Sequence, residues 1–250
     1  EVEIHSKLEH PNILKFVGAV LEDPSRYCIV TAFMEGGTLY DALHVKRISI
    51  DFTLRVAIGQ GMAAGMSHLH ELKVPVIHRD LNSHNVLLSN KLTPVIADFG
   101  ESRQIKGRQK AIPRVAKNMT LQPGNLRWMA PEVFQQNALY SLNADVFSYG
   151  LVLWETVTGE IPFHKLEPAA AAAQMAYHGQ RPFIPPSCPP PISSVLHGCW
   201  QADADTRPKL VDIAAWFGYK YYSHLPQYTD KLAAQPETVR ESNNRRLEAI

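Results

Sequence analysis

The stretch "HRDLNSHN", residues 78–85, is the most informative part of this sequence, because it holds a carboxylate, Asp80, and an amide, Asn85, five positions apart. Apolar "VPVI" precedes it and "VLL" follows it, which predicts a polar turn between short strands. "ADFG", residues 97–100, adds a second carboxylate, Asp98. Such a set offers a proton acceptor and hard oxygen ligands for a divalent cation. It favours chemistry in which a phosphoryl group is transferred with the help of Mg²⁺.

The composition is that of an ordinary globular protein. The chain has 250 residues, 45% of them hydrophobic and 20% charged, with a formal net charge of +1. The near-zero charge argues against nucleic-acid or membrane binding, which usually demands a strong basic excess. No apolar run approaches the roughly 18 residues that a membrane span requires. The three cysteines lack metal-ligand spacing, so we expect reduced thiols and a cytoplasmic location. The oligomeric state stays open.

Apolar periodicity predicts strands near the start of the chain and a mainly helical remainder. Residues 1–10 have the pattern of the end of an amphipathic helix, which Pro11 would terminate. Asp51 is placed to cap a helix. The predicted elements are two strands over 13–22 and 26–33, short strands between 76 and 100, an irregular loop over 101–129, and helices over 39–44, 51–71, 144–159, 167–179 and 211–222.

The motifs "HRDLNSHN", "ADFG" and "APE" (130–132) follow one another in the order of the protein-kinase signature set. With "RWMAPEVF" and "ADVFSYG", the chain resembles the catalytic domain of eukaryotic protein kinases of the tyrosine-kinase-like group. The resemblance implies an α+β, two-lobed fold, consisting mainly of the helical C-lobe with a remnant of the N-lobe. It divides the chain into residues 1–34 (end of helix C, two or three strands and the hinge), 35–222 (C-lobe) and 223–250 (polar tail).

The resemblance also implies roles for individual residues, with ATP and Mg²⁺ as cofactors and a protein as substrate. The catalytic set is Asp80 as the base, Arg79 as the partner of a phosphorylated activation segment, and Asn85. The implied Mg²⁺ ligands are Asn85 and Asp98. The ATP-binding set is Thr31 at the gatekeeper position, the backbones of Ala32 and Met34 at the hinge, Leu87 below the adenine, Asp98, and Glu1 at the helix-C glutamate position. Taken alone, Thr31 would be an ordinary strand residue.

Five further residues are implied in structural roles. His78 and Phe99 would belong to a buried stack that links the lobes. Glu132 and Arg207 would form a buried ion pair between "APE" and the body of the lobe. Asp145 would hold the backbone of "HRD". We expect the loss of Glu132, Arg207 or Asp145 to damage folding more than chemistry.

Some positions depart from the family pattern. Asn82 stands where Ser/Thr kinases usually have a lysine, and Asn125 where they usually have a threonine that bonds the catalytic Asp. An amide can also donate a hydrogen bond, so the preference between Ser/Thr and Tyr stays open. His5 falls at an apolar stack position, where it could be a packed neutral histidine or could lower the stability of the active arrangement. Ser102 and Thr120 lie in the activation segment, where phosphate on Thr120 could pair with the "HRD" arginine or the hydroxyls could stay unmodified.

A glycine-rich phosphate loop and the strand lysine of the family are not found in these residues. "GQGMAAG", residues 59–65, has the wrong spacing and lies in a helical pattern, and neither Lys7 nor Lys15 follows a strand motif. Because the first residue is Glu1, we expect the chain to be part of a longer protein. Because the loop and the lysine supply much of the electrostatic stabilisation of the phosphates, we expect the chain to be inactive by itself. Two functions remain: a protein kinase, or a pseudokinase or scaffold that acts through its C-lobe.

Overall fold

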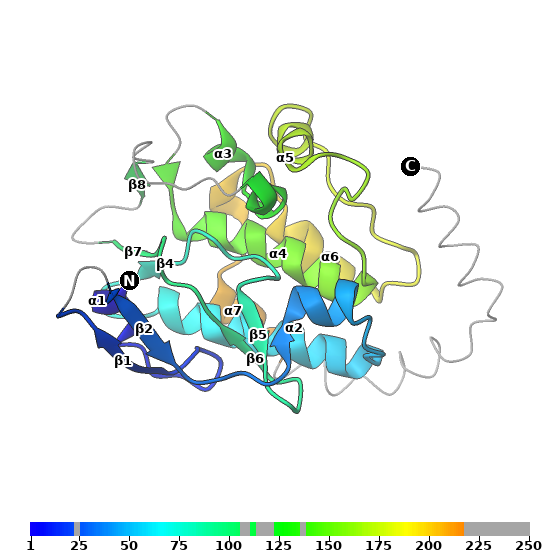
Figure 1. The fold of residues 1–250 in the computed structure, drawn as a ribbon. Coiled ribbons are helices and arrows are strands. Elements are labelled where there is room, and N and C mark those ends of the chain that lie inside the picture. The colour runs from blue at the N-terminus through cyan, green and yellow to red at the C-terminus, as the bar shows by residue number, and fades with distance from the viewer. Residues whose placement is uncertain (23–25, 106–110, 114–122, 136–138, 218–250) are drawn as a thin grey trace.

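A computed structural model describes residues 1–22, 26–105, 111–113, 123–135 and 139–217. Its helices are α1 (Val2–His5), η2 (Asp41–Val45), α2 (Phe52–His70), η3 (Pro123–Trp128), α3 (Pro131–Phe134), α4 (Leu142–Thr158), α5 (Pro168–Tyr177), α6 (Pro190–Cys199), η4 (Ala204–Thr206) and α7 (Leu210–Trp216). Its strands are β1 (Phe16–Val20), β2 (Cys28–Thr31), β3 (Gly37–Thr38), β4 (Val76–Ile77), β5 (Val86–Leu88), β6 (Pro94–Ile96), β7 (Arg103–Gln104), β8 (Ile112–Pro113) and β9 (Leu139–Tyr140). Figure 1 shows β1, β2 and α1 at one end of the molecule and the helices beyond them.

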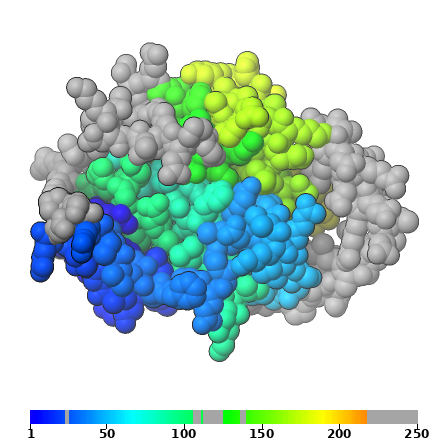
Figure 2. Space-filling view, in the orientation of Figure 1, coloured from blue at the N-terminus to red at the C-terminus, as the bar shows by residue number. Residues whose placement is uncertain are grey.

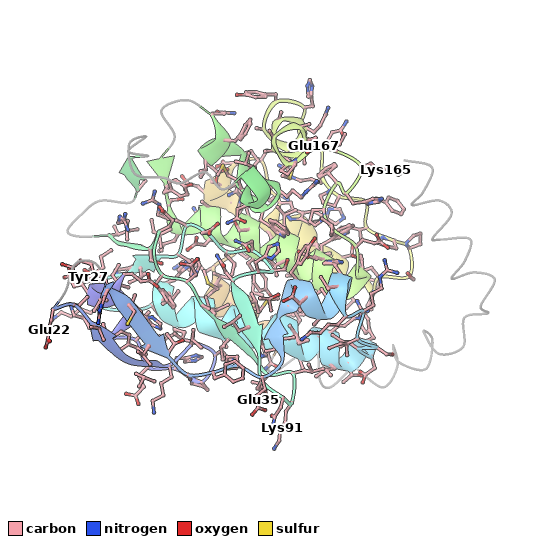
Figure 3. All side chains as sticks on the ribbon, in the orientation of Figure 1. Glu22, Tyr27, Glu35, Lys91, Lys165 and Glu167 are labelled. Carbon is pink, nitrogen blue, oxygen red and sulfur yellow. The ribbon has the colours of Figure 1, made fainter. Side chains whose placement is uncertain are left out.

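The two strands predicted near the start form an antiparallel pair. β1 and β2 pair with Ala19 opposite Ile29, and Figure 3 shows Glu22 and Tyr27 toward the turn end of this hairpin. In the space-filling view, the first residues of the chain, which include β1 and β2 and are drawn in blue, make up one end of the visible face (Figure 2). The first strands are thus set apart from the helical body, as the two-lobed prediction requires.

The prediction of a helix as far as residue 10 is wrong, because α1 ends at His5. After it, Lys7 and Leu8 make only tight backbone bonds to residues three positions before them. The ring of His10 then accepts the N–H of Asn12, which fixes a turn around Pro11. The change to three-residue backbone bonds ends the helix, and the local side-chain bond and Pro11 keep the chain from resuming it.

Backbone bonds join the first segment to the central sheet. β3, β5 and β6 form an antiparallel sheet, and Ile13 makes a parallel bridge to Ile96. Gly65 of α2 packs so close to this junction that a Cβ there would lie 2.5 Å from the carbonyl oxygen of Asn12. A glycine is needed at that crossing, which agrees with the interpretation of "GQGMAAG" as helix rather than phosphate loop.

The core lies among the long helices. α4 is buried on nearly all sides, as its apolar composition predicted, and Figure 1 shows it in the middle of the helical body. α2 packs against α4 and α7. Its cap is confirmed, since the Asp51 side chain accepts the N–H of Leu54 at 2.9 Å. Hydrophobic burial among these helices provides a rigid support for the polar turns that follow β4 and β6.

Two helical elements differ from the sequence-based predictions. The short helix expected over 39–44 is a π-helical turn, η2, and α6 was not predicted. The fold class, an α+β kinase-like fold dominated by its helical lobe, is confirmed. The division at residue 34 stays a prediction, and the tail falls outside the described residues. Among the described helices, none combines the length and hydrophobicity needed to cross a membrane.

Candidate active site

The turn after β4 is held by one buried carboxylate. Asp145, which is 1% exposed, accepts the backbone N–H groups of His78 at 2.8 Å and Arg79 at 3.0 Å. It also accepts from the ring of His70 at 2.9 Å, a contact that sequence reasoning missed. Arg79 has a left-handed backbone, with φ of 74°, which is costly for a residue with a Cβ. The predicted role of Asp145 in holding "HRD" is thus confirmed, because it fixes the strained turn.

Asp80 follows this turn and lies among three amides. Asn125 donates to both carboxylate oxygens at 3.0 Å, and Asn85 donates to Oδ2 at 2.9 Å. Asn82 donates to Oδ1 at 3.2 Å, while its own amide oxygen accepts the N–H of His84. The carboxylate is therefore fixed in orientation by donors from its own loop and from η3, far away in sequence.

The environment changes the acidity of Asp80. Burial raises the pKa of its carboxyl above the ordinary value, and the nearby Asp98 carboxylate raises it further. His78 and the hydrogen bonds from Asn85 and Asn125 act in the opposite direction and lower the pKa. A half-buried carboxylate with a raised pKa is suited to accept a proton from a hydroxyl group.

Asp98 and Glu1 bring two further carboxylates to this region. A Cβ on Gly100 would lie 3.2 Å from Oδ1 of Asp98 and 3.7 Å from Oε2 of Glu1. Asp98 is exposed and left-handed, with φ of 62°, and within the described residues no Lys or Arg pairs with it. The amide nitrogen of Asn85 is used on Asp80, which leaves its oxygen for another partner. Hard oxygens and uncompensated negative charge fit a divalent cation such as Mg²⁺.

Three of the residues predicted to meet adenine come together. Ala32, Met34 and Leu87 pack on a small cluster of buried apolar residues, namely Leu14, Val95 and Ala97. This cluster is separate from the main core and lies where the first segment meets β5 and β6. Thr31 precedes it at the end of β2, opposite Phe16. Figure 3 shows Glu35, just after these residues, and Lys91 of the β5–β6 turn on the same outer edge.

Aromatic rings connect the two parts of the molecule. Phe99 is fully buried, with its ring centroid 5.4 Å from that of His78 and 4.7 Å from that of His5. His5 also meets Phe16 at 5.5 Å and contacts the carbonyl oxygen of Leu14 at 2.7 Å. The predicted stack of His78 and Phe99 is confirmed, and His5 takes part in it as a packed histidine. The Nδ1 atom of the His5 ring is buried and has no hydrogen-bond partner among the described residues.

Similarity to known proteins agrees with this geometry. Residues 1–217 match the family model described as protein tyrosine and serine/threonine kinase. The chain belongs to this protein kinase family. It is 51% identical over 213 residues to the serine/threonine-protein kinase TNNI3K of Mus musculus and, equally, to that of Homo sapiens. It is also 36% identical over 214 residues to the dual specificity protein kinase pyk3 of Dictyostelium discoideum.

These matches cover most of the kinase chain but a smaller part of its relatives. The alignment spans 85% of this chain and 25% of each TNNI3K, and 15% of pyk3. The chain thus spans about a quarter of the length of the TNNI3K proteins that it matches. The resemblance to the kinase family is confirmed, and activities and partners of a whole protein are matters of proposal.

Three contacts involve the arginines that the resemblance singled out, Arg207 and Arg79. Glu132 and Arg207 form the predicted ion pair, with two bonds of 2.6 and 2.8 Å. Arg79 lies over the ring of Tyr140 at 4.6 Å and faces Glu101 at 3.9 Å. Its predicted phosphate-bearing partner, Thr120, lies outside the described residues. Ser102 has no exposed surface and donates to the carbonyl oxygen of His78, so modification of its hydroxyl would require local opening.

The kinase residues predicted from sequence therefore fall into two neighbouring groups. One consists of Asp80 with Asn85 and Asp98, and Glu1 reaches it beside Gly100; the other is the apolar platform of Ala32, Met34 and Leu87. Their chemical roles stay predictions. Sequence reasoning missed His70 and Glu155, the second of which is a fully buried carboxylate. A glutamate inside the apolar stretch "GLVLWETV" was the signal that could have found it.

Proposed function

We propose that the protein carrying this chain is a Mg²⁺- and ATP-dependent protein kinase that phosphorylates Ser or Thr hydroxyls, with Tyr also open as an acceptor. The observation that carries the proposal is the Asp80 carboxylate, oriented by three amides and placed near a second carboxylate, Asp98. Family membership and the names of the relatives, which are serine/threonine and dual specificity kinases, support it.

In the proposed reaction, Asp80 accepts the proton of the substrate hydroxyl as its oxygen attacks. Asn125 and Asn85 hold the carboxylate so that one orientation is presented to the hydroxyl. Asn85, through its amide oxygen, and Asp98 would hold the metal, and bound Mg²⁺-ATP would supply the phosphoryl group and neutralise its charge. Positioning and electrostatics, rather than covalent chemistry by the protein, would provide the acceleration.

The nucleotide would use the second group of residues. We assign the adenine to the platform of Ala32, Met34 and Leu87, with Thr31 at its inner end. Glu1 would pair with a lysine, and in the described part of the chain no lysine is paired with it. Because the chain spans about a quarter of the length of the TNNI3K proteins, the activity is proposed for the full-length protein. Arg79 would bind a phosphorylated activation segment. We further propose a cytoplasmic protein that acts on protein substrates.

A pseudokinase or scaffold is the second candidate. It is favoured by the lysines of the first segment: Lys7 is exposed and pairs with Glu3 at 3.7 Å, and Lys15 is exposed. In the described part of the chain, neither lysine forms an ion pair with Asp98. In that case the C-lobe would serve as a binding surface, and the carboxylates near Asp80 would have no catalytic use.

The test is transfer of labelled phosphate from ATP to peptides with Ser, Thr or Tyr, catalysed by the full-length protein. The proposal predicts transfer that stops when EDTA removes divalent cations. Asp98→Ala should lose binding of Mg²⁺-ATP and transfer together, because an implied metal ligand is gone. A folded full-length protein that binds its partners but never transfers phosphate would instead establish the scaffold.

A further inference from the structure

One buried carboxylate has no part in the proposed chemistry. Glu155 lies in the last turn of α4 and has no exposed surface. Burying a carboxylate is costly unless hydrogen bonds compensate for the lost water. Its Oε1 accepts from the hydroxyl of Ser83 at 2.7 Å and from the ring of His44 at 2.8 Å. Its Oε2 accepts from the indole N–H of Trp128 at 2.8 Å, so the carboxylate accepts three hydrogen bonds from described residues.

The three donors belong to three segments that are far apart in sequence. Ser83 lies in the turn after β4, between the two asparagines of that turn that donate to Asp80. Trp128 ends η3, and η3 also carries Asn125, the third amide that donates to Asp80. His44 lies in η2. The Glu155 carboxylate thus binds both segments that orient Asp80, the turn after β4 and η3.

Aromatic side chains cover these tethers. The rings of Tyr40 and His84 stack with centroids 3.9 Å apart, and His84 meets Trp128 edge-on at 6.0 Å. Trp128 is itself only 3% exposed. Exclusion of water strengthens hydrogen bonds to a charged acceptor, which makes the arrangement stiff.

We propose that Glu155 is a positioning residue, which holds the turn after β4 and η3 in register so that amides from both reach Asp80. This inference depends on the proposed function only where it predicts a change in the rate of phosphate transfer. η3 is also bound through its backbone, since Ser148 donates to the carbonyl oxygen of Trp128 at 2.7 Å. Loss of Glu155 would therefore loosen η3 and the turn without releasing them.

The test uses the full-length protein and variants that remove tethers separately. Glu155→Leu removes all acceptors, whereas Ser83→Ala and Trp128→Phe each remove one donor. Glu155→Gln is the conservative variant, because its carbonyl can accept from the indole while its amide donates to the serine hydroxyl. Thr156→Val is the matched control: Thr156 is buried beside Glu155 but donates only within its own helix, to Val152.

For Glu155→Leu we expect kcat for peptide phosphorylation to fall roughly 10- to 100-fold while KM for ATP changes by less than about twofold, since the acceptor is misplaced and the nucleotide platform is untouched. Glu155→Gln should recover most of the lost kcat, and Thr156→Val should resemble wild type. Each single-donor variant should lose less than Glu155→Leu. If Glu155→Gln is as impaired as Glu155→Leu, or if Thr156→Val is as impaired as both, tethering by hydrogen bonds is wrong.

Hydrogen–deuterium exchange gives a readout that needs no activity. The amides of residues 80–86 and 125–129 should exchange faster in Glu155→Leu than in wild type, and no faster in Thr156→Val. Unchanged exchange in these two segments, or an increase in only one of them, would overturn the positioning role. An inactive wild type with this exchange pattern would contradict the proposed function and leave the tether standing.

Discussion

Replacing Glu132 with Ala should strongly destabilise the helical lobe. The carboxylate makes two bonds, of 2.6 and 2.8 Å, to Arg207, whose side chain has no exposed surface. After the change, the buried guanidinium keeps only backbone acceptors, the carbonyl oxygens of Gln201 and Asn143, and the ring of Phe147 beneath it. Removing one partner of a fully buried pair costs about 3–5 kcal/mol, because a charge is left uncompensated. The Glu132 side chain is 28% exposed, so water can partly replace it and we expect a cost of about 2–3 kcal/mol. We expect this loss in the free energy of unfolding, measured by urea denaturation.

Three further variants decide whether the buried charge of Arg207 is the cause. The double variant Glu132→Leu with Arg207→Met should be more stable than Glu132→Leu alone, because no charge remains buried. Glu3→Ala breaks the exposed pair with Lys7 and should change stability by less than about 0.5 kcal/mol. A cost below about 1 kcal/mol for Glu132→Ala, or a double variant less stable than the single one, would refute the reasoning.

Other predictions concern acidity and thiol reactivity. As the pH decreases, phosphate transfer should be lost when Asp80 becomes protonated, because the protonated form cannot accept a proton. Because the pKa of Asp80 is raised, this loss should occur at a higher pH than for an ordinary aspartate. Asn125→Leu removes a donor that lowers this pKa and should move the acid limb of the pH–rate profile further upward; an unmoved limb would show that another group is titrating. In thiol labelling at mildly alkaline pH, exposed Cys28 should react first, since burial raises the pKa of Cys188 and of Cys199 to about 12. Labelling of Cys199 as fast as Cys28 in the folded protein would contradict that burial.

Helices with strong local signals were predictable from sequence. The cap and apolar spacing of 51–71 led to a helix observed as Phe52–His70. α6 was missed because it begins at Pro190, within a run of prolines that indicated a break. Proline is accepted in the first turn of a helix, where its missing N–H has no intrahelical partner, so the same residues could start a helix.

The contacts of the candidate site also differ in how far they could be predicted from the sequence. Asp80 and Asn85 are five residues apart, and their contact could be predicted from a local motif. The bond from Asn125 spans 45 positions, and its expectation came from family resemblance. Glu155 gathers partners up to 111 positions away, which only the packing of α4 against the turns brings together. No local pattern encodes such contacts, apart from a charged residue in an otherwise apolar helix.

The most direct test of the proposed active site compares the full-length protein with its Asp80→Ala variant, measuring phosphate transfer to a hydroxyl peptide and ATP binding in parallel. If Asp80 is the proton acceptor, transfer should fall by about 10² to 10⁴, the contribution of a general base, while ATP binding is retained. Full turnover by Asp80→Ala would contradict the account, because the carboxylate that three amides orient would then have no part in the reaction.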